Sequence, residues 1–133
     1  MDTFEIEIVT PEKLVVKDTA EEAQIPGKNG YLGILPGHAP LITELAVGEV
    51  SYRNGSVVSR FALAWGFAEV LPHKVTILVE TAERANEIDV NRAQAAKARA
   101  EQTLQSNALD IDYDAVQNAL KRAEVRLEVA AKG

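Results

Sequence analysis

The chain has 133 residues, of which 47% are hydrophobic, and it carries a formal net charge of −6 with no cysteine. This length suits one ordinary core with an appendage, and no apolar run approaches the roughly 20 residues that a membrane-spanning helix needs. Without cysteine there are no disulfides or thiolate metal sites, and an acidic chain lacks the basic surface that binds nucleic acid. We therefore expect no nucleic-acid partner and no direct membrane insertion.

Residues 4–79 read as short strands separated by turn sequences. Phe4, Ile6 and Ile8 alternate with glutamates, which is typical of a half-buried strand. Turns with proline or glycine recur every few residues, and Asn54 followed by Gly55 predicts a two-residue hairpin. The expected strands are 4–8, 14–17, 20–25, 31–35, 41–45, 49–52, 57–62, 64–70 and 75–80. Many short strands at this spacing favour a small antiparallel sandwich or barrel.

Three aromatic residues near the end of this region are candidates for the sandwich core: Phe61, Trp65 and Phe67. Strand alternation then places Ala64 and Gly66 on the opposite face. Because these two residues are small, we expect that face to permit close approach by another protein.

After residue 81 the hydrophobic period changes to about three and a half, which predicts helices. One seam consists of Val116, Leu120, Ala123, Leu127 and Ala130, and a narrower one of Ala93, Ala96, Ala100 and Leu104. The link at 106–112 is short, so we expect an antiparallel hairpin. Asp89 is the expected N-cap of the first helix, and Asp110 or Asp112 that of the second. Alanine seams bury little apolar area, so the hairpin should be marginal and movable.

These patterns predict an α+β fold, with an N-terminal antiparallel β-sandwich (1–85) followed by a C-terminal antiparallel two-helix hairpin (86–133). No catalytic or metal site is expected. His38 and His73 lie in proline-containing turns, and no nucleophile or metal set accompanies the carboxylates of Glu83 and Asp89. The glycine-rich stretch 27–33 lacks the Gly-Lys-Ser/Thr ending of a phosphate loop.

Four arginines of the helical region have spacings that suit an anion site. Arg92 and Arg99 are seven residues apart, hence on one helix face and about 10 Å apart along the axis. Arg122 and Arg126 are four apart and neighbours on the second helix. Folding the hairpin can bring the two pairs together, where guanidinium groups suit phosphate oxygens.

Five segments of the chain are distinctive: GILPGHAPL at 33–41, GFAEV at 66–70, KVTIL at 74–78, AERA at 82–85 and IDVNRA at 88–93. Together they resemble the ε subunits of bacterial F-type ATP synthases, and the resemblance covers the whole chain. The resemblance implies a non-catalytic subunit, peripheral on the cytoplasmic face of the inner membrane. Its sandwich would bind the γ subunit and the membrane c-ring, and its helices would extend to the α/β catalytic head and inhibit ATP hydrolysis.

The resemblance also implies an ATP site, with ATP as a regulatory ligand. The family signature, Ile or Leu followed by Asp-x-x-Arg-Ala, is matched at 88–93. The residues implied in ATP binding are Glu83, Ile88, Asp89, Arg92, Ala93, Arg99, Arg122 and Arg126. In the loop at 36–40, Gly37 and His38 are implied in contact with the rotor ring or γ.

Other interpretations remain open at this point. The arginines can belong to a solvated helix face, with Glu124 and Glu128 close enough to neutralise Arg122 and Arg126. The hairpin can also stay folded in a purely structural coupling protein that ignores nucleotide. A third interpretation is a free-standing ATP sensor without a rotary partner.

Overall fold

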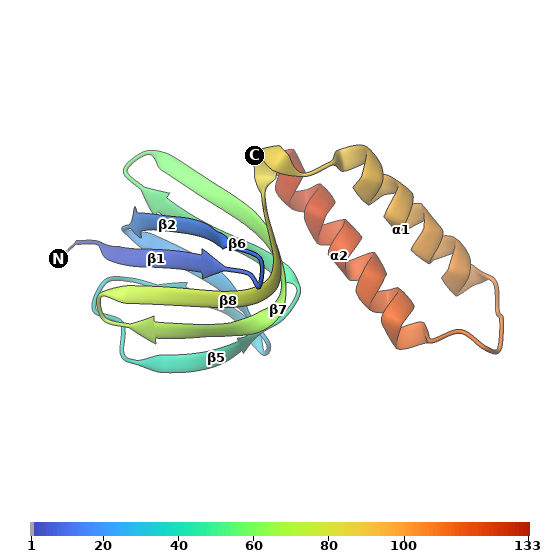
Figure 1. The fold of residues 1–133 in the computed structure, drawn as a ribbon, viewed down its shortest axis with the longest axis horizontal. Helices are drawn as coiled ribbons and strands as arrows, with labels where there is room; N and C mark the ends of the chain where they lie inside the picture. Colours follow the sequence, from blue (N-terminus) through green and yellow to red (C-terminus); the bar gives the residue numbers. More distant parts are fainter. Residues whose placement is uncertain (1) are drawn as a thin grey trace.

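The computed structural model describes residues 2–133, in which eight strands precede two helices (Figure 1). The elements are β1 (Phe4–Val9), β2 (Leu14–Ala20), β3 (Glu22–Gly27), β4 (Gly30–Ile34), β5 (Leu41–Leu45), β6 (Gly48–Asn54), β7 (Val57–Leu71), β8 (Lys74–Arg84), the 3₁₀ turn η1 (Ala85–Glu87), α1 (Val90–Gln105) and α2 (Tyr113–Lys132). The predicted α+β architecture, a sandwich followed by an antiparallel helix pair, is confirmed.

The strands form one hydrogen-bonded sheet that folds over on itself to make the sandwich. Its order is β2-β1-β8-β7-β5-β3-β4, and β6 pairs with both β3 and β7. All pairs among the described residues are antiparallel except β1 with β8, which is parallel. The sequence patterns did not anticipate this parallel pair, because the two strands are about 70 residues apart and no turn sequence records their relative direction.

The strand β7 is a single 15-residue strand where two strands, 57–62 and 64–70, were predicted. Its interruption is a kink at Trp65, whose φ is +48°. The kink changes the phase of the alternation: Phe61 points inward before it, whereas Ala68 points inward after it and Phe67 is 55% exposed. The prediction that Phe67 belongs to the core is therefore wrong, and Trp65 is only half-buried.

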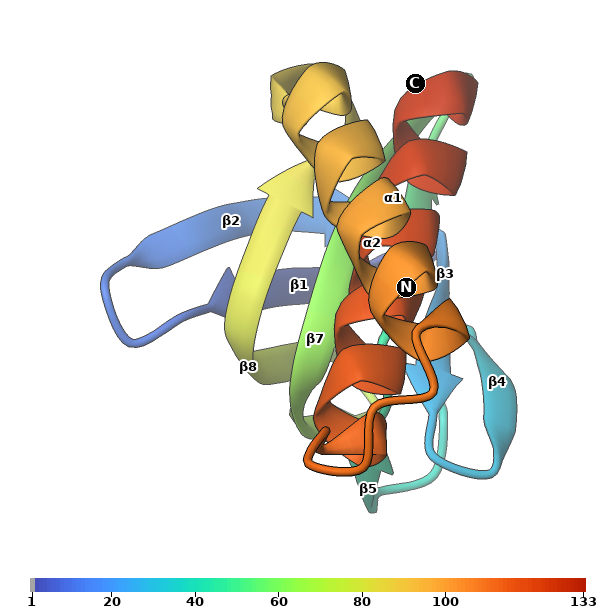
Figure 2. The same cartoon turned by 90° about the vertical axis from the view of Figure 1, so that its right-hand side faces the viewer.

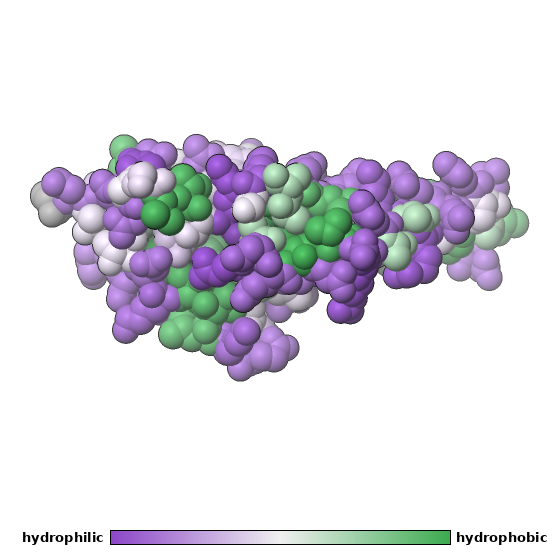
Figure 3. All heavy atoms as spheres, turned by 90° about the horizontal axis from the view of Figure 1, so that it is seen from above, coloured by the Kyte–Doolittle hydropathy of each residue, from purple (hydrophilic) through white to green (hydrophobic). Residues whose placement is uncertain are grey.

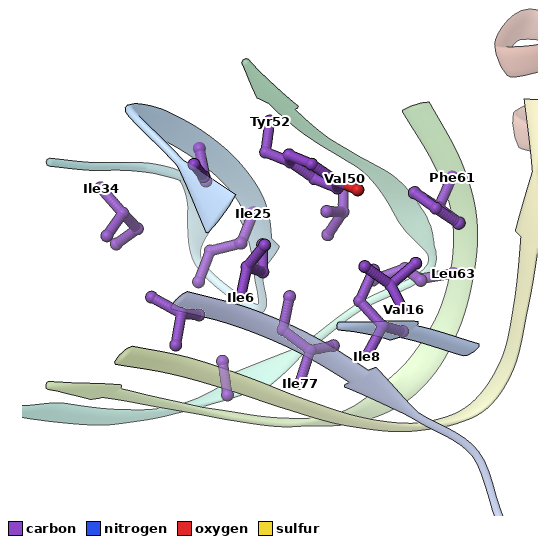
Figure 4. Close-up of a cluster of buried hydrophobic side chains, with 14 of the residues drawn as sticks. Ile6, Ile8, Val16, Ile25, Ile34, Val50, Tyr52, Phe61, Leu63 and Ile77 are labelled. Atoms are coloured by element: carbon purple, nitrogen blue, oxygen red, sulfur yellow. The ribbon is translucent and has the colours of Figure 1, made fainter. Parts of the chain in front are cut away.

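The main core lies between the two layers and is built from aliphatic side chains of nearly every strand (Figure 4). Ile6 and Ile8 of β1 and Ile77 of β8 are fully buried and face Ile25 and Phe61 of the opposing layer. Full burial of a side chain of this size stabilises the fold by about 1.5–3 kcal/mol. No helical residue belongs to this core cluster within the described chain.

The two helices form the predicted hairpin, and both are capped by aspartate. The carboxylate of Asp89 accepts a hydrogen bond from the backbone N–H of Arg92 at 3.0 Å, and that of Asp112 accepts one from Ala115 at 3.1 Å. Asp112, not Asp110, is therefore the second cap. At the end of α1, Asn107 takes a φ of +55°, a left-handed conformation that commonly terminates helices.

The helix α2 lies between α1 and the sandwich (Figures 1 and 2). A second apolar cluster joins this helix to the sandwich, made of Ala62, Ala85, Ile88, Val125 and Val129. The predicted seam residue Ala123 is buried. Val125 and Val129, which dock the two-helix hairpin of residues 86–133 (the arm) on the sandwich, lie outside the predicted seam. Figure 3 shows apolar atoms where the arm meets the sandwich and a mostly hydrophilic surface along the arm.

The small residues of β7 pack against other elements of this chain, whereas we expected them to face another protein. Ala62 and Ala64 are buried although they point away from the main core, because α2 covers this face of the strand. At Gly66, an added Cβ would lie 1.9 Å from the backbone oxygen of Leu78. The close approach predicted for Ala64 and Gly66 is thus made, within this chain, by its own α2 and β8.

Candidate functional site

The segment that leads from β8 through η1 into α1 carries the first group of predicted site residues. Ile88 is 8% exposed and packs with Ala85 and Val125 in the second apolar cluster. Ile88 therefore anchors the η1–α1 connection in this apolar cluster. Glu83, at the end of β8, and Asp89, the cap of α1, stand on either side of this anchor.

The start of α1 presents a polar face beside that segment. The cap at Asp89 fixes the first turn, because its carboxylate satisfies one of the free N–H groups there. Arg92 and Arg99 are both exposed, whereas Ala93 between them is buried. On this face of α1, a small buried alanine therefore lies between two exposed guanidinium groups.

A cleft of about 580 Å³ opens between this face and the sandwich. Six of the eight predicted ATP-site residues line it, namely Glu83, Asp89, Arg92, Ala93, Arg99 and Arg126. They come from β8, α1 and α2, so the fold brings together residues as much as 43 positions apart. Clefts of 300–1,000 Å³ are typical of small-molecule sites.

The other two predicted residues do not line this cleft. Ile88 is turned into the apolar cluster described above. Arg122 extends over the face of Trp65, with its guanidinium carbon 5.1 Å from the ring centroid. This distance falls within the range of a cation–π contact. The prediction that Arg122 joins the other arginines around one anion does not describe this conformation.

Arg126 lines the cleft, but its charge is already matched. Its Nε donates to the Glu83 carboxylate in a close ion pair between α2 and β8. The predicted neighbours on α2, Glu124 and Glu128, form no ion pair with it among the described residues. Both arginines of α2 thus contact the sandwich in this conformation. The interpretation that they belong to a solvated helix face does not describe this structure.

A further ion pair holds the end of α2. Lys132 Nζ lies 3.0 Å from Glu49 Oε1, and Arg60 Nη1 lies 3.1 Å from Oε2 of the same carboxylate. Glu49 is 15% exposed at its side chain and so bridges the two cations in a partly dry site. The closed arm therefore has three polar attachments to the sandwich, through Trp65, Glu83 and Glu49.

Sequence reasoning missed the residues that the sandwich contributes to the cleft. They are Thr10, Glu12, Lys13 and Val15 near the β1–β2 turn, with Glu80 and Thr81 of β8. The turn residues are at least 73 positions from the signature, and nothing in their local pattern distinguishes them from an ordinary reversal. Only pairing of β1 beside β8 brings the turn next to α1.

The predicted rotor-contact loop lies at the end of the sandwich opposite the arm (Figure 1). Gly37 has a φ of +84°, which favours glycine, and its N–H donates to the Pro72 carbonyl at 2.8 Å. His38 Nδ1 lies 2.7 Å from the Ala39 carbonyl oxygen. The β4–β5 loop and the β7–β8 turn are thereby joined into one surface.

The outer face of the sandwich carries a row of apolar side chains in register across four strands. Leu14 pairs with Val9, Val9 with Leu78, and Leu78 with Phe67. Leu14, Leu78 and Phe67 are each more than half exposed. A hollow of about 450 Å³ lies over part of the row. The row is therefore an exposed apolar strip on the outside of the sandwich.

Within residues 2–133, no helix is long and apolar enough to cross a membrane. In the same residues, no three histidine, aspartate or glutamate side chains gather in an arrangement that would hold a metal ion.

Comparison with known proteins gives a consistent picture. The family profile for the ATP synthase delta/epsilon chain β-sandwich domain matches residues 3–85, and that for the long α-helix domain matches 86–131. The ATP synthase epsilon chain of Koribacter versatilis is 74% identical over 106 residues, covering 80% of this chain and 75% of the relative. That of Geotalea daltonii is 46% identical over 132 residues, covering 98% and 96%.

Solved structures share the fold. A chain in the cryo-EM structure of the Euglena gracilis mitochondrial ATP synthase aligns with a TM-score of 0.84 at 22% identity, covering 98% of this chain and 82% of that one. A chain in the Tetrahymena thermophila central stalk and c-ring structure aligns with a TM-score of 0.58 at 19% identity, covering 97% and 94%.

Proposed function

The chain belongs to the ATP synthase delta/epsilon chain family, and from this membership we propose that it is a non-catalytic rotor subunit with an ATP-responsive regulatory arm. The sandwich couples a γ subunit to the membrane c-ring at the cytoplasmic face of the inner membrane. The helical hairpin inhibits ATP hydrolysis when it opens. The observation that supports the regulatory part is the cleft between sandwich and α1, which is lined by six of the eight predicted ATP-site residues.

ATP in this cleft would favour the closed arm by linkage. The cleft exists only while α1 lies beside β8, so a ligand that occupies it binds the closed state and not the open one. At a concentration one hundred times its dissociation constant, such a ligand stabilises the closed state relative to the open state by about 2.7 kcal/mol. The apolar contact between arm and sandwich is a small cluster that consists mainly of alanine and valine, so an increment of this size is a substantial addition to it.

In the open state the basic residues of α2 become available to another surface. Arg122 and Arg126 would leave Trp65 and Glu83 and, with Lys121, present three cations along one helix. We propose that this helix extends to acidic surface on the α/β catalytic head. The same arginines thus serve two exclusive states, and the balance between them sets the degree of inhibition.

The sandwich offers two surfaces for the coupling role. The apolar row Leu14, Val9, Leu78 and Phe67 is the proposed γ-binding face, because it is exposed here and would be buried in a stable complex. The joined loops that hold Gly37 and His38 are the proposed contact with the c-ring. The arm occupies the opposite end, where it can move without disturbing that contact.

One alternative function is favoured by a specific observation. The three polar attachments at Trp65, Glu83 and Glu49 hold the arm on the sandwich through protein contacts alone. If they suffice, the protein is a purely structural coupling subunit whose hairpin does not respond to ATP.

ATP titration of the full chain, followed by thermal unfolding, separates the two functions. We expect ATP to raise the unfolding temperature of the parent by several degrees and to raise that of Arg99→Ala much less. Lys121→Ala is the matched control, because this exposed cation lies outside the cleft. Absence of any ATP-dependent shift in the parent would leave the structural alternative standing.

A further inference from the structure

We propose that Asn54 is a site of spontaneous deamidation, and that Glu21 suppresses the reaction by holding the backbone N–H of Gly55 with its carboxylate. The site lies in the turn between β6 and β7, outside the cleft beside α1. It is therefore separate from the proposed ATP response.

An asparagine followed by glycine can lose its side-chain nitrogen without an enzyme. The backbone nitrogen of the glycine attacks the asparagine Cγ, and the new N–C bond closes a five-membered imide. The N–H proton passes through solvent to the departing side-chain nitrogen, which leaves as ammonia. Water then opens the imide to aspartate or isoaspartate. Glycine favours this reaction, because it has no side chain to hinder the attacking nitrogen.

The chain contains two such pairs, Asn29 with Gly30 and Asn54 with Gly55. Each pair lies where two antiparallel strands are joined, and all four residues are exposed, so water reaches both sites. The pairs differ in what binds the glycine N–H. The Gly55 N–H donates to the side chain of Glu21, whereas no side chain accepts a hydrogen bond from the Gly30 N–H within residues 2–133.

The Glu21 carboxylate belongs to a small network that closes over the turn. Arg53 Nη1 lies 3.3 Å from the Glu21 oxygen that accepts from the Gly55 N–H. The same nitrogen donates to the Gly55 carbonyl at 3.3 Å, and the Glu21 N–H donates to the Arg53 carbonyl at 2.8 Å. Gly55 is thus bound at both its N–H and its carbonyl, by residues that flank the turn in space.

Two effects of this network oppose the attack on Asn54. The Gly55 N–H must give up a hydrogen bond to a charged acceptor before its nitrogen can approach the Asn54 Cγ. The nitrogen must also lose its proton, and a neighbouring carboxylate disfavours the negative charge that develops there. Arg53 offsets part of the carboxylate charge, so the hydrogen bond is the larger of the two effects.

Protection of this turn also preserves the surface on which α2 docks. The turn sets the register of β6 on β7, and isoaspartate would lengthen the backbone of the turn by a carbon atom. Glu49 of β6 and Arg60 of β7 pair across these strands, and Glu49 also binds Lys132 at the end of the arm. A change in register would move these partners apart.

The test is incubation of the full chain in mildly alkaline buffer, followed by peptide mapping with mass spectrometry. Conversion of amide to acid is measured separately at Asn54 and Asn29, in the parent and in Glu21→Ala. We expect Glu21→Ala to deamidate at Asn54 about tenfold faster than the parent, which corresponds to loss of one hydrogen bond to a charged group. The rate at Asn29 should be unchanged, so this residue is the internal reference for the stability of the sheet.

Glu22→Ala is the matched control. This neighbouring glutamate also pairs with Arg53, at 3.8 Å, but among residues 2–133 it forms no hydrogen bond with Gly55. We therefore expect the parent rate at Asn54 in this variant.

Three results would overturn the inference. Equal rates at Asn54 in Glu21→Ala and in the parent would show that the carboxylate does not protect the turn. A slower rate in Glu21→Ala would show that the carboxylate acts as a base for the attack. Equal acceleration at Asn54 and Asn29 would show that Glu21 acts through the stability of the whole sheet and not through its contact with Gly55.

Discussion

Arg122 contacts an aromatic ring of the sandwich, so its environment can be followed by spectroscopy. In the closed state its guanidinium covers the ring of Trp65, which is the only tryptophan of the chain. We expect Arg122→Ala to shift the fluorescence emission to the red, because the ring gains contact with water. We also expect it to destabilise the closed arm by about 0.5–1 kcal/mol, the usual size of an accessible cation–π contact.

Lys121→Ala is the control for that measurement, since its side chain is exposed and is not part of the contact with Trp65. An emission maximum that is the same in Arg122→Ala and in the parent would show that the contact does not persist in solution.

Gly66 is the residue where β7 has no room for a side chain. A Cβ there would meet the backbone oxygen of Leu78 at 1.9 Å, whereas one at Gly33 would meet nothing within 4 Å. We expect Gly66→Ala to lower the free energy of unfolding by about 3 kcal/mol, and Gly33→Ala to change it by less than about 0.5 kcal/mol. Urea unfolding of both variants checks this, and equal stabilities would contradict the strand pairing at the kink.

Tyr52 couples the core to the pH of the solution. Burial, followed by the hydrogen bond that its hydroxyl donates to Asp18 at 2.8 Å, raises the pKa of this tyrosine above its usual value of 10.0. A raised pKa means that the folded state holds the proton longer than the unfolded state does. The stability from this group is therefore complete below about pH 10 and is lost as pH rises through the folded-state pKa.

We expect the free energy of unfolding of the parent to fall more steeply above pH 10 than that of Tyr52→Phe, which has no proton to lose there. Denaturant titrations between pH 8 and 11 measure this. Parallel pH profiles for the two proteins would show that Tyr52 titrates alike in both states.

Among the secondary-structure elements, α2 begins at a single capping residue that has a natural control nearby. Asp112 accepts a hydrogen bond from the Ala115 N–H, whereas Asp110, two residues earlier, lies outside the helix. We expect Asp112→Ala to destabilise the arm by about 1 kcal/mol and Asp110→Ala to cost only a few tenths. Amide hydrogen exchange in α2 should report the difference, and equal protection in both variants would rule out the cap.

For the whole molecule, the separation of the two apolar clusters determines what truncation does. The main core contains no helical residue among those described, so a chain that ends at Glu87 keeps that core. We expect this truncated chain to assemble with its proposed partners and to raise ATP hydrolysis by the complex several-fold, since the arm that we propose to be inhibitory is gone. Hydrolysis equal to that of the full complex would remove the inhibitory role and leave the coupling role.

The features that could be predicted from the sequence are those set by near neighbours. The hairpin at Asn54 and Gly55 joins β6 to β7 as expected, because a two-residue turn depends on its own φ angles. The aspartate cap of each helix, at Asp89 and Asp112, acts within three residues. The strand 41–45 and both helices follow from the period of their apolar side chains.

What only the tertiary structure decided depends on segments that lie far apart in the chain. The parallel pairing of β1 with β8 brings Lys13 to the cleft, and no local pattern encodes it. The kink at Trp65 reverses the side-chain alternation and exposes Phe67. The sequence by itself determined which residues carry charge and which helices they occupy. Packing of α2 on the sandwich decided that Arg122 contacts an aromatic ring and that Arg126 pairs with a carboxylate. A guanidinium group that loses contact with water needs a partner, and the partner is whichever group the packing places next to it.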